Sequence, residues 1–106
     1  MLSGEDIKFL RERLDLRQRE FGALIGLSHA HEKRGVAMYE RGDSTPCWQV
    51  LRHLRTLTAV ANAICALQLG KPALASELLE EIFIGNGAVP IDDEKIATMK
   101  VRNANN

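Results

Sequence analysis

Two short segments near the N-terminus, LRQREFGALIG (residues 16–26) and VAMYERGDSTP (residues 36–46), carry the strongest structural signals in this chain. Each has apolar residues at helical spacing and contains a glycine that can end a helix, Gly26 in the first and Gly42 in the second. We therefore expect two consecutive helices, one over about residues 17–25 and one that ends at Gly42. The residues expected to face the core are Phe21, Leu24, Ile25, Val36 and Tyr39.

Further helices are expected on both sides of this pair. Ser3 is a suitable cap for a helix over about residues 4–15, because Asp6 stands three residues later. Pro46 predicts the start of a long helix that ends at Gly70. Along this helix Trp48, Leu51, Leu54, Leu57 and Ile64 recur at helical spacing, and Trp48 is expected in or at the edge of the core.

The last third of the chain predicts one more long helix and a tail. The helix is expected over about residues 72–84. In the tail, residues 89–91 are expected to be extended, Asp92 is a suitable cap for a short helix through Met99, and residues 103–106 are expected to be disordered.

The composition fits a single soluble domain. Of the 106 residues 45% are apolar and 26% are charged, which is ordinary for a globular protein and leaves no room for two full cores. The sequence shows neither the apolar core of a signal peptide nor a run long enough to cross a bilayer. We therefore expect a cytoplasmic protein, bacterial or phage-encoded and associated with the nucleoid.

The two cysteines are expected to be free thiols. Cys47 and Cys65 are 18 positions apart in one predicted helix, which would hold them about 27 Å apart and prevent a disulfide between them. Free thiols fit a reducing compartment, and both are interpreted as small apolar residues that fill space in the core.

Taken together, the segments resemble helix-turn-helix regulators of the phage-repressor, or XRE, type. The shared features are Gln18, Gly22, Gly26, Val36, Tyr39-Glu40-Arg41-Gly42 and Pro46. The chain departs from the family in having glycine at position 22, where alanine is usual, and tyrosine at position 39, where tryptophan is commoner. The resemblance covers about residues 5–57. It implies an all-α fold, a repressor-like helix-turn-helix bundle of four to five helices with a C-terminal helical dimerisation extension.

One departure concerns the turn between the two helices. Gly26 and Tyr39 are separated by about four residues more than is usual in the family. A helix that started early, at Ser28, would carry the carboxylate of Glu32 into the core without an obvious partner, which is costly. We therefore expect an enlarged turn over residues 28–31 and a helix that starts near Glu32.

The second of the two helices is expected to read DNA in the major groove, with an arginine near its start suited to guanine. Lys33 and Arg34 are the candidates for base contacts, while Gln18, by resemblance, contacts phosphate or supports the recognition helix. The full set of candidate DNA-binding residues is Arg17, Gln18, Arg19, Ser28, His29, His31, Lys33, Arg34, Ala37, Met38 and Arg41. The alternative for the charged residues is a solvated surface, and the two histidines of the turn are only a weak metal signal.

The second half of the chain predicts self-association. Residues 57–67 are apolar almost all round a helix, so they must be covered on more than one side. A two-fold homodimer would supply that cover, and the alternative is that the following helix folds back within one chain. The residues expected at the dimer interface are Leu57, Val60, Ala61, Ile64, Leu67, Leu78, Ile82 and Phe83.

The expected function is that of a transcriptional regulator, most simply a homodimeric repressor on an inverted-repeat operator. Residues 1–57 would form the DNA-binding domain, residues 58–85 the helical extension and residues 86–106 a partly disordered tail. A mildly basic stretch from Arg17 to Arg55 and an acidic remainder fit this division. The alternatives are an antitoxin-like or phage accessory protein whose second half binds a protein partner, or an interaction module without DNA binding. No catalytic set, cofactor or metal is expected.

Overall fold

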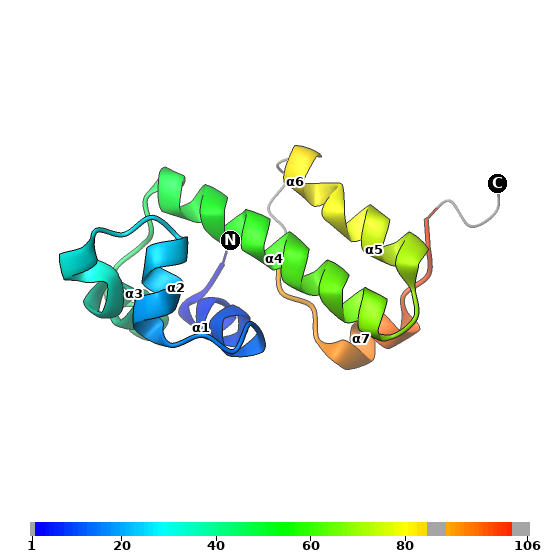
Figure 1. Cartoon of the computed structure of the whole chain (residues 1–106), viewed down its shortest axis with the longest axis horizontal. Coiled ribbons are helices and arrows are strands. Elements are labelled where there is room, and N and C mark those ends of the chain that lie inside the picture. The colour runs from blue at the N-terminus through cyan, green and yellow to red at the C-terminus, as the bar shows by residue number, and fades with distance from the viewer. Residues whose placement is uncertain (1, 85–88, 103–106) are drawn as a thin grey trace.

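The fold is organised around one long helix. The computed structural model describes residues 2–84 and 89–102, and these are all-α, with no strand among them. Helix α4 (Trp48–Gln68) runs through both halves of the molecule (Figure 1). The other elements are α1 (Gly4–Arg13), α2 (Gln18–Leu24), the 3-10 turn η1 (His29–His31), α3 (Glu32–Arg41), α5 (Pro72–Leu79), α6 (Glu81–Ile84) and α7 (Asp93–Thr98). None of the helices in these ranges is both long and apolar enough to cross a membrane.

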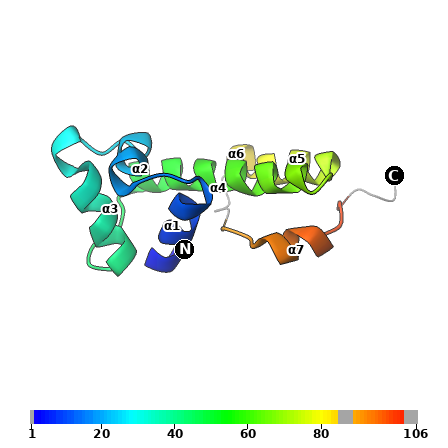
Figure 2. The same cartoon turned by 60° about the horizontal axis from the view of Figure 1, so that its bottom comes forward.

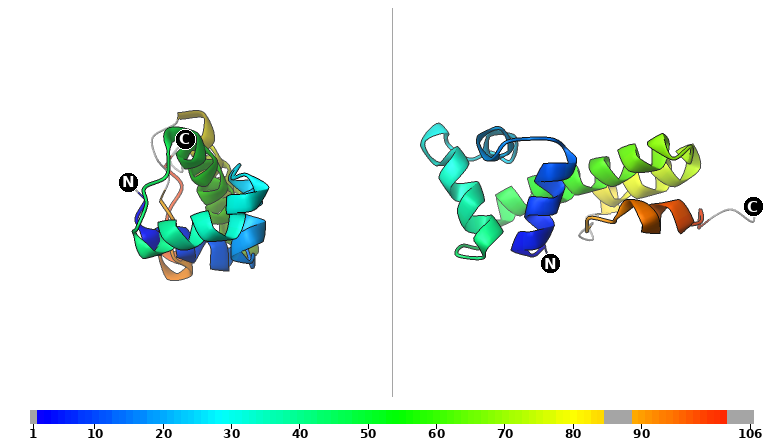
Figure 3. Two further views of the ribbon diagram at one scale, coloured as in Figure 1. Left: turned by 90° about the vertical axis from the view of Figure 1, so that its left-hand side faces the viewer. Right: turned by 90° about the horizontal axis from the view of Figure 1, so that it is seen from below.

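Two groups of helices pack on different parts of α4. Helices α1–α3 gather around its N-terminal half, and α3 runs steeply across its direction (Figure 2). Helix α5 returns beside the C-terminal half, and α7 lies along another side of it (Figure 3). The buried apolar side chains accordingly form two clusters. The first is Leu2, Ile7, Leu10, Phe21, Ile25, Val36, Val50, Leu54 and Ala61, and the second is Ala63, Cys65, Ala66, Leu74, Ala75, Leu78 and Ile96.

Local sequence sets both ends of α1. The hydroxyl of Ser3 accepts a hydrogen bond from the backbone N–H of Asp6, and the Asp6 carboxylate accepts one from the N–H of Ser3, so the predicted cap is confirmed. The helix ends at Arg13 rather than at residue 15, because Asp15 adopts a left-handed backbone with φ of 56°. The chain thereby turns directly into α2.

Two apolar residues expected in the core are at the surface. Leu24 is 50% exposed, because the inward face of α2 centres on Phe21 and Ile25 and leaves Leu24 at its edge. Trp48 is 61% exposed: α4 begins at Trp48 itself, two residues after Pro46, and its inward face follows Val50 and Leu54 instead.

The enlarged turn is confirmed, although the reason for expecting it was incomplete. Residues 29–31 form η1 and α3 begins at Glu32, as predicted. Glu32 is nevertheless buried, with 8% of its surface exposed. Its carboxylate lies 3.0 Å from Nδ1 of His29, so the turn itself supplies the partner that an early helix start would have lacked.

Gly22 sets the close approach of α2 and α3. A Cβ built on Gly22 would lie 2.3 Å from the carbonyl oxygen of Glu32, a backbone atom that cannot move aside alone. Alanine, the usual residue of the resembling family at this point, therefore does not fit here. The two helices pack at this distance because residue 22 has no side chain.

We expect Gly22→Ala to destabilise the fold by about 1–3 kcal/mol through overpacking. In an open helix the same change would stabilise by up to about 1 kcal/mol, so the sign of the effect is diagnostic. Urea unfolding followed by circular dichroism measures it. Ala23→Gly, at an exposed position of the same helix, is the matched control and is expected to cost only about 1 kcal/mol of helix propensity. A Gly22→Ala protein as stable as the parent would contradict the close approach.

In the C-terminal half, the expected single helix over residues 72–84 is two helices. Pro72 is at the first turn of α5, as its fixed φ favours, but the helix ends at Leu79 and α6 starts at Glu81. Gly70, with φ of +74°, ends α4 as predicted. Two small side chains of α4, Ala63 and Ala66, lie in the cluster with Leu74, Ala75 and Leu78 of α5 and let the two helices pack closely.

The C-terminal segment (residues 89–102) packs on α4 instead of forming a loose tail. Asp92 caps α7 by accepting from the N–H of Lys95, as predicted. The predicted disorder of residues 103–106 lies outside the described residues. Ile96 of α7 is completely buried in the second cluster.

Polar side chains of the earlier helices hold the start of this segment. Asn62 of α4, itself buried, donates to the carbonyl of Val89 (3.0 Å) and accepts from the N–H of Ile91 (3.1 Å). Arg13 of α1 donates to the carbonyl of Ile91 at 2.7 Å and pairs with Asp93. Side chains of α1 and α4 thus bond to the carbonyl of Val89 and to both backbone polar groups of Ile91.

The end of the segment is fixed in the same way. Lys71 donates to the carbonyls of Ile96 (3.2 Å) and Met99 (3.0 Å), which lie at the C-terminal end of α7. The carboxylate of Glu77 accepts from the N–H of Arg102 at 2.8 Å. Residues from three helices thus anchor the segment along its length.

The two thiols are expected to differ strongly in reactivity. Cys65 is buried, which raises its pKa above the usual 9.0, and its Sγ donates to Asp93, which raises it further. Cys47 is exposed at the N-cap of α4, so its interpretation as a core residue was wrong. Thiolate is the reactive species. In alkylation with iodoacetamide at pH 8, we expect Cys47 to react rapidly and Cys65 only after denaturation. Mass spectrometry of the digested protein would separate the two sites, and equal rates would contradict the burial of Cys65.

Candidate nucleic-acid interface

A buried polar network fixes α1, α2 and α3 relative to one another. The Glu40 carboxylate accepts from Nε of Arg11 at 2.6 Å and from Nε2 of Gln18 at 3.1 Å. Arg11 also donates to the carbonyl of Leu16 at 3.0 Å. The side chains of Arg11 and Glu40 are only 15% and 7% exposed. The hydrogen bond to Glu40 raises the pKa of the Arg11 guanidinium and outweighs the opposite effect of burial.

This network explains what Gln18 does within the protein. Its amide contacts α3 by donating to Glu40, so the side chain links the start of α2 to α3. The same side chain also reaches the surface, since it lines a depression together with Arg11, Arg17, Arg19 and Lys33. Four cationic side chains therefore line one hollow at the start of α2 and α3.

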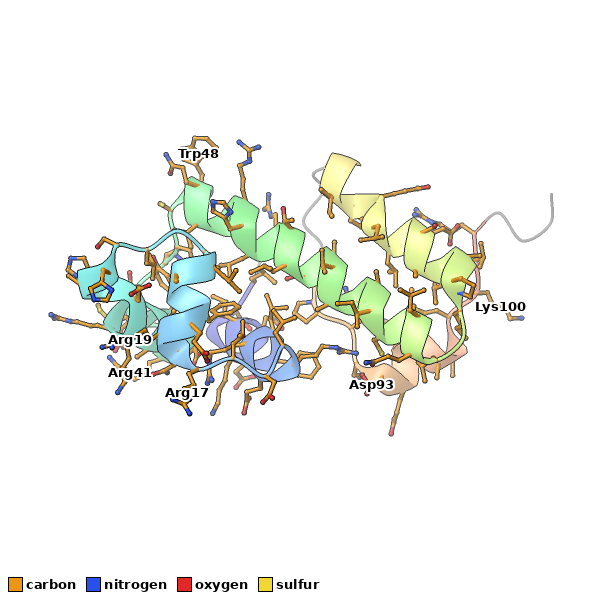
Figure 4. All side chains as sticks on the ribbon, in the orientation of Figure 1. Arg17, Arg19, Arg41, Trp48, Asp93 and Lys100 are labelled. Atoms are coloured by element: carbon orange, nitrogen blue, oxygen red, sulfur yellow. The ribbon has the colours of Figure 1, made fainter. Side chains whose placement is uncertain are left out.

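Three of the four cations around this hollow, all except Arg11, are available to an external anion. Arg17, Arg19 and Lys33 are exposed, and among the described residues no ion pair involves any of them. Figure 4 shows Arg17, Arg19 and Arg41 along the same edge of the molecule. Arg41 is exposed and forms an ion pair with Asp43 at 2.8 Å, which solvent can break at small cost.

The outer surface of α3 carries the residues predicted to read bases. Lys33 and Arg34 are exposed in its first turn, whereas Ala37 and Met38 are half-buried further along. Ser28, His29 and His31 are exposed on the enlarged turn that leads into this helix. The fold thus brings the candidate residues of α2, η1 and α3 to one end of the molecule.

His29 has a further contact. Its Nδ1 lies 3.0 Å from the Glu32 carboxylate, although the His29 side chain is 92% exposed. Within the described ranges, no three His, Cys, Asp or Glu side chains gather into a group that could hold a metal ion.

Sequence reasoning missed two residues of this region, Arg11 and Glu40. The signal was helical spacing: Arg11 stands four positions after Ile7, and Glu40 four positions after Val36, so both fall on inward faces. Two opposite charges on inward faces of helices expected to pack together indicate a buried pair.

The predicted dimer residues fall into three groups. Ala61 and Leu78 are buried within the protomer, Ala61 in the first cluster and Leu78 in the second, where α5 folds back on α4 as the alternative supposed. Ile64, Leu67 and Ile82 are 43%, 55% and 37% exposed. Leu57 and Val60 are half-buried, and the side chain of Phe83 lies outside the described residues.

Comparison of the chain with known protein families, curated proteins and solved structures gave no match. The features that point to a function are therefore the motif in residues 16–46 and the geometry of the charged surface at the start of α2 and α3. The geometry is the more specific of the two, because it places the exposed charges of Arg17, Arg19 and Lys33 at the starts of α2 and α3.

Proposed function

We propose that this protein is a sequence-specific double-stranded DNA-binding transcriptional regulator with a repressor-like helix-turn-helix, and that it acts as a homodimer. The observation that carries the proposal is the surface at the start of α2 and α3. There the exposed, cationic start of α3 follows the short helix α2. Gly22 and the Gln18–Glu40 contact hold the two helices together. This arrangement suits a helix presented to the major groove.

The residues divide into two roles. Lys33 and Arg34, in the exposed first turn of α3, are suited to base edges, and a bidentate arginine contact to guanine is the commonest specific contact. Arg17, Arg19 and Gln18 line the cationic hollow, where they would contact a backbone phosphate. Phosphate contacts position the protein, and base contacts give sequence preference.

A homodimer is proposed from the exposed stripe of α4. Val60, Ile64 and Leu67 lie at helical spacing on one side of the helix and keep apolar surface in water. A second copy packed along this stripe would cover it and place two α3 helices for an inverted repeat. Such a dimer, bound over a promoter, would act as a steric repressor.

The test is selection of bound sequences from random duplex DNA, followed by titration of the best site. We expect an inverted repeat to be enriched, and Arg34→Ala to weaken its binding by about 1–3 kcal/mol, or about 5- to 150-fold. Lys100→Ala is the charge-matched control, because Lys100 is exposed at the far end of the molecule (Figure 4). No enriched sequence, or equal effects of the two substitutions, would count against the proposal.

A further inference from the structure

A second notable surface lies at the start of α4. Trp48 is the only tryptophan of the chain and is 61% exposed. The guanidinium of Arg52, one helical turn later, lies 5.6 Å from the centre of its ring. Trp48 projects at the opposite edge of the molecule from Arg17 and Arg19 in Figure 4. The protein therefore keeps a paired aromatic and arginine in water, apart from both hydrophobic clusters and from the cationic edge.

The Trp48–Arg52 pair forms a ridge between two hollows. The larger has a volume of about 460 Å³, lies between α4 and α6, and is called here the Trp48 groove. Besides the ridge it is lined by Leu51, Arg55, Thr56, Glu81 and Ile82. The smaller hollow, of about 350 Å³, lies on the other side of the ridge and is also lined by Gln49 and His53.

The chemistry of the Trp48 groove is apolar with an excess of positive charge. Leu51 and Ile82 contribute apolar surface, and Ile82 is 37% exposed. Two arginines face a single glutamate, Glu81, and in the parts of the chain that the structure describes no ion pair engages Arg52 or Arg55. Tryptophan and arginine are the residues most enriched among those that dominate protein–protein binding energy.

We propose that the Trp48 groove binds an acidic, amphipathic helix of another protein. Its leucine or aromatic side chains would pack on Trp48, Leu51 and Ile82, while its carboxylates would pair with Arg52 and Arg55. The site is separate from the cationic surface of α2 and α3, so the proposal stands whether or not the protein binds DNA.

A second copy and a DNA backbone fit this groove less well. At 3.6 residues per turn, the stripe of Val60, Ile64 and Leu67 lies about 100–160° around α4 from Trp48, so a dimer formed along that stripe would be centred on another side of the helix. A DNA backbone would gain nothing from the apolar lining and would be repelled by Glu81. DNA bound along the edge of Arg17 and Arg19 would also face away from Trp48 (Figure 4).

The single tryptophan reports directly on this site. The probe is a short synthetic helical peptide with glutamate on one face and leucine and phenylalanine on the other, titrated while Trp48 emission is followed. We expect a saturable blue shift as the ring leaves water, confirmed by calorimetry. One control peptide has lysine in place of glutamate, and a second has alanine in place of the apolar residues. Each is expected to bind at least about tenfold more weakly.

Variants then assign the binding to the arginines. Arg52→Glu changes an exposed residue, so the fold is expected to survive, and it should weaken peptide binding at least about tenfold in calorimetry. Lys100→Glu makes the same charge change far from the groove and should leave binding unchanged. The proposal fails if no shift occurs, if the lysine peptide binds equally well, or if Arg52→Glu binds like the parent. It also fails if random-sequence duplex DNA alone produces the shift, or if the shift follows protein concentration without peptide, because the occupant would then be DNA or a second copy.

Discussion

Glu40→Ala is expected to lower the free energy of unfolding by about 3–5 kcal/mol, as removal of one partner from a buried ion pair commonly does. The substitution would leave the guanidinium of Arg11, only 15% exposed, without its carboxylate, and would free the amide of Gln18 at the same time. Stability of a domain of this size is itself only about 5–15 kcal/mol, so the variant should be near the limit of folding. Urea unfolding monitored by circular dichroism gives the value.

A double substitution separates the effect of the two charges from the effect of the volume that the side chains fill. Replacing Arg11 and Glu40 together by methionine removes both charges and keeps apolar volume, so most of the loss should be recovered. Arg41→Ala is the control for a surface pair, since its bond to Asp43 is exposed to solvent and should contribute about 0–1 kcal/mol. If Glu40→Ala were no more harmful than Arg41→Ala, the network would not be what fixes α1, α2 and α3.

The Gln18–Glu40 contact also belongs to the surface that is proposed to bind DNA. Glu40 lies on α3 and Gln18 at the start of α2, so their contact sets how the exposed start of α3 stands relative to the cationic hollow. Glu40, which is expected to stabilise the fold, and Gln18, which lines the hollow, are therefore joined by one hydrogen bond. Loss of Glu40 should weaken DNA binding through position, even though Glu40 itself offers no cation to DNA.

Features encoded by neighbouring residues were predictable from the sequence. The caps of α1 and α7 follow from Ser3 with Asp6 and from Asp92, and Gly42 and Gly70 end their helices with positive φ. Each of these depends on groups a few positions apart, which a reading of the chain compares directly. The enlarged turn before α3 was expected from the family spacing between Gly26 and Tyr39, but the burial of Glu32 was not.

Features that depend on distant residues were not predictable in the same way. Arg11 and Glu40 are 29 positions apart, and Asn62 is 29 positions from Ile91. Periodicity marks a polar residue on an inward face but does not say which distant group it meets. Trp48 shows the opposite limit. An aromatic residue at helical spacing is expected in the core, but the buried face of α4 follows Val50 and Leu54 and leaves Trp48 in water.

The C-terminal segment provides the second large effect, because Ile96→Ala should cost about 2–5 kcal/mol by leaving a cavity. Ile96 is fully buried among Ala63, Ala66 and Leu74, where small neighbours have few rotamers with which to fill the space. Ile96→Val should cost only about 0.5–1.5 kcal/mol at the same position. Lys95→Ala, at the preceding exposed position of α7, is the surface control and is expected within about 0.5 kcal/mol of the parent.

The thiol of Cys65 supplies an independent readout of the same substitution. Because Cys65 donates to Asp93, at the start of α7, release of the segment from α4 should uncover the thiol. Ile96→Ala should therefore speed alkylation of Cys65 in the native protein while leaving the rate at Cys47 unchanged. If the variant unfolded like the parent and its Cys65 stayed protected, residues 89–102 would be an accessory to the fold. If both measurements change together, the segment is part of the same cooperative unit as α4 and α5, and a division that treats it as a separate tail is wrong.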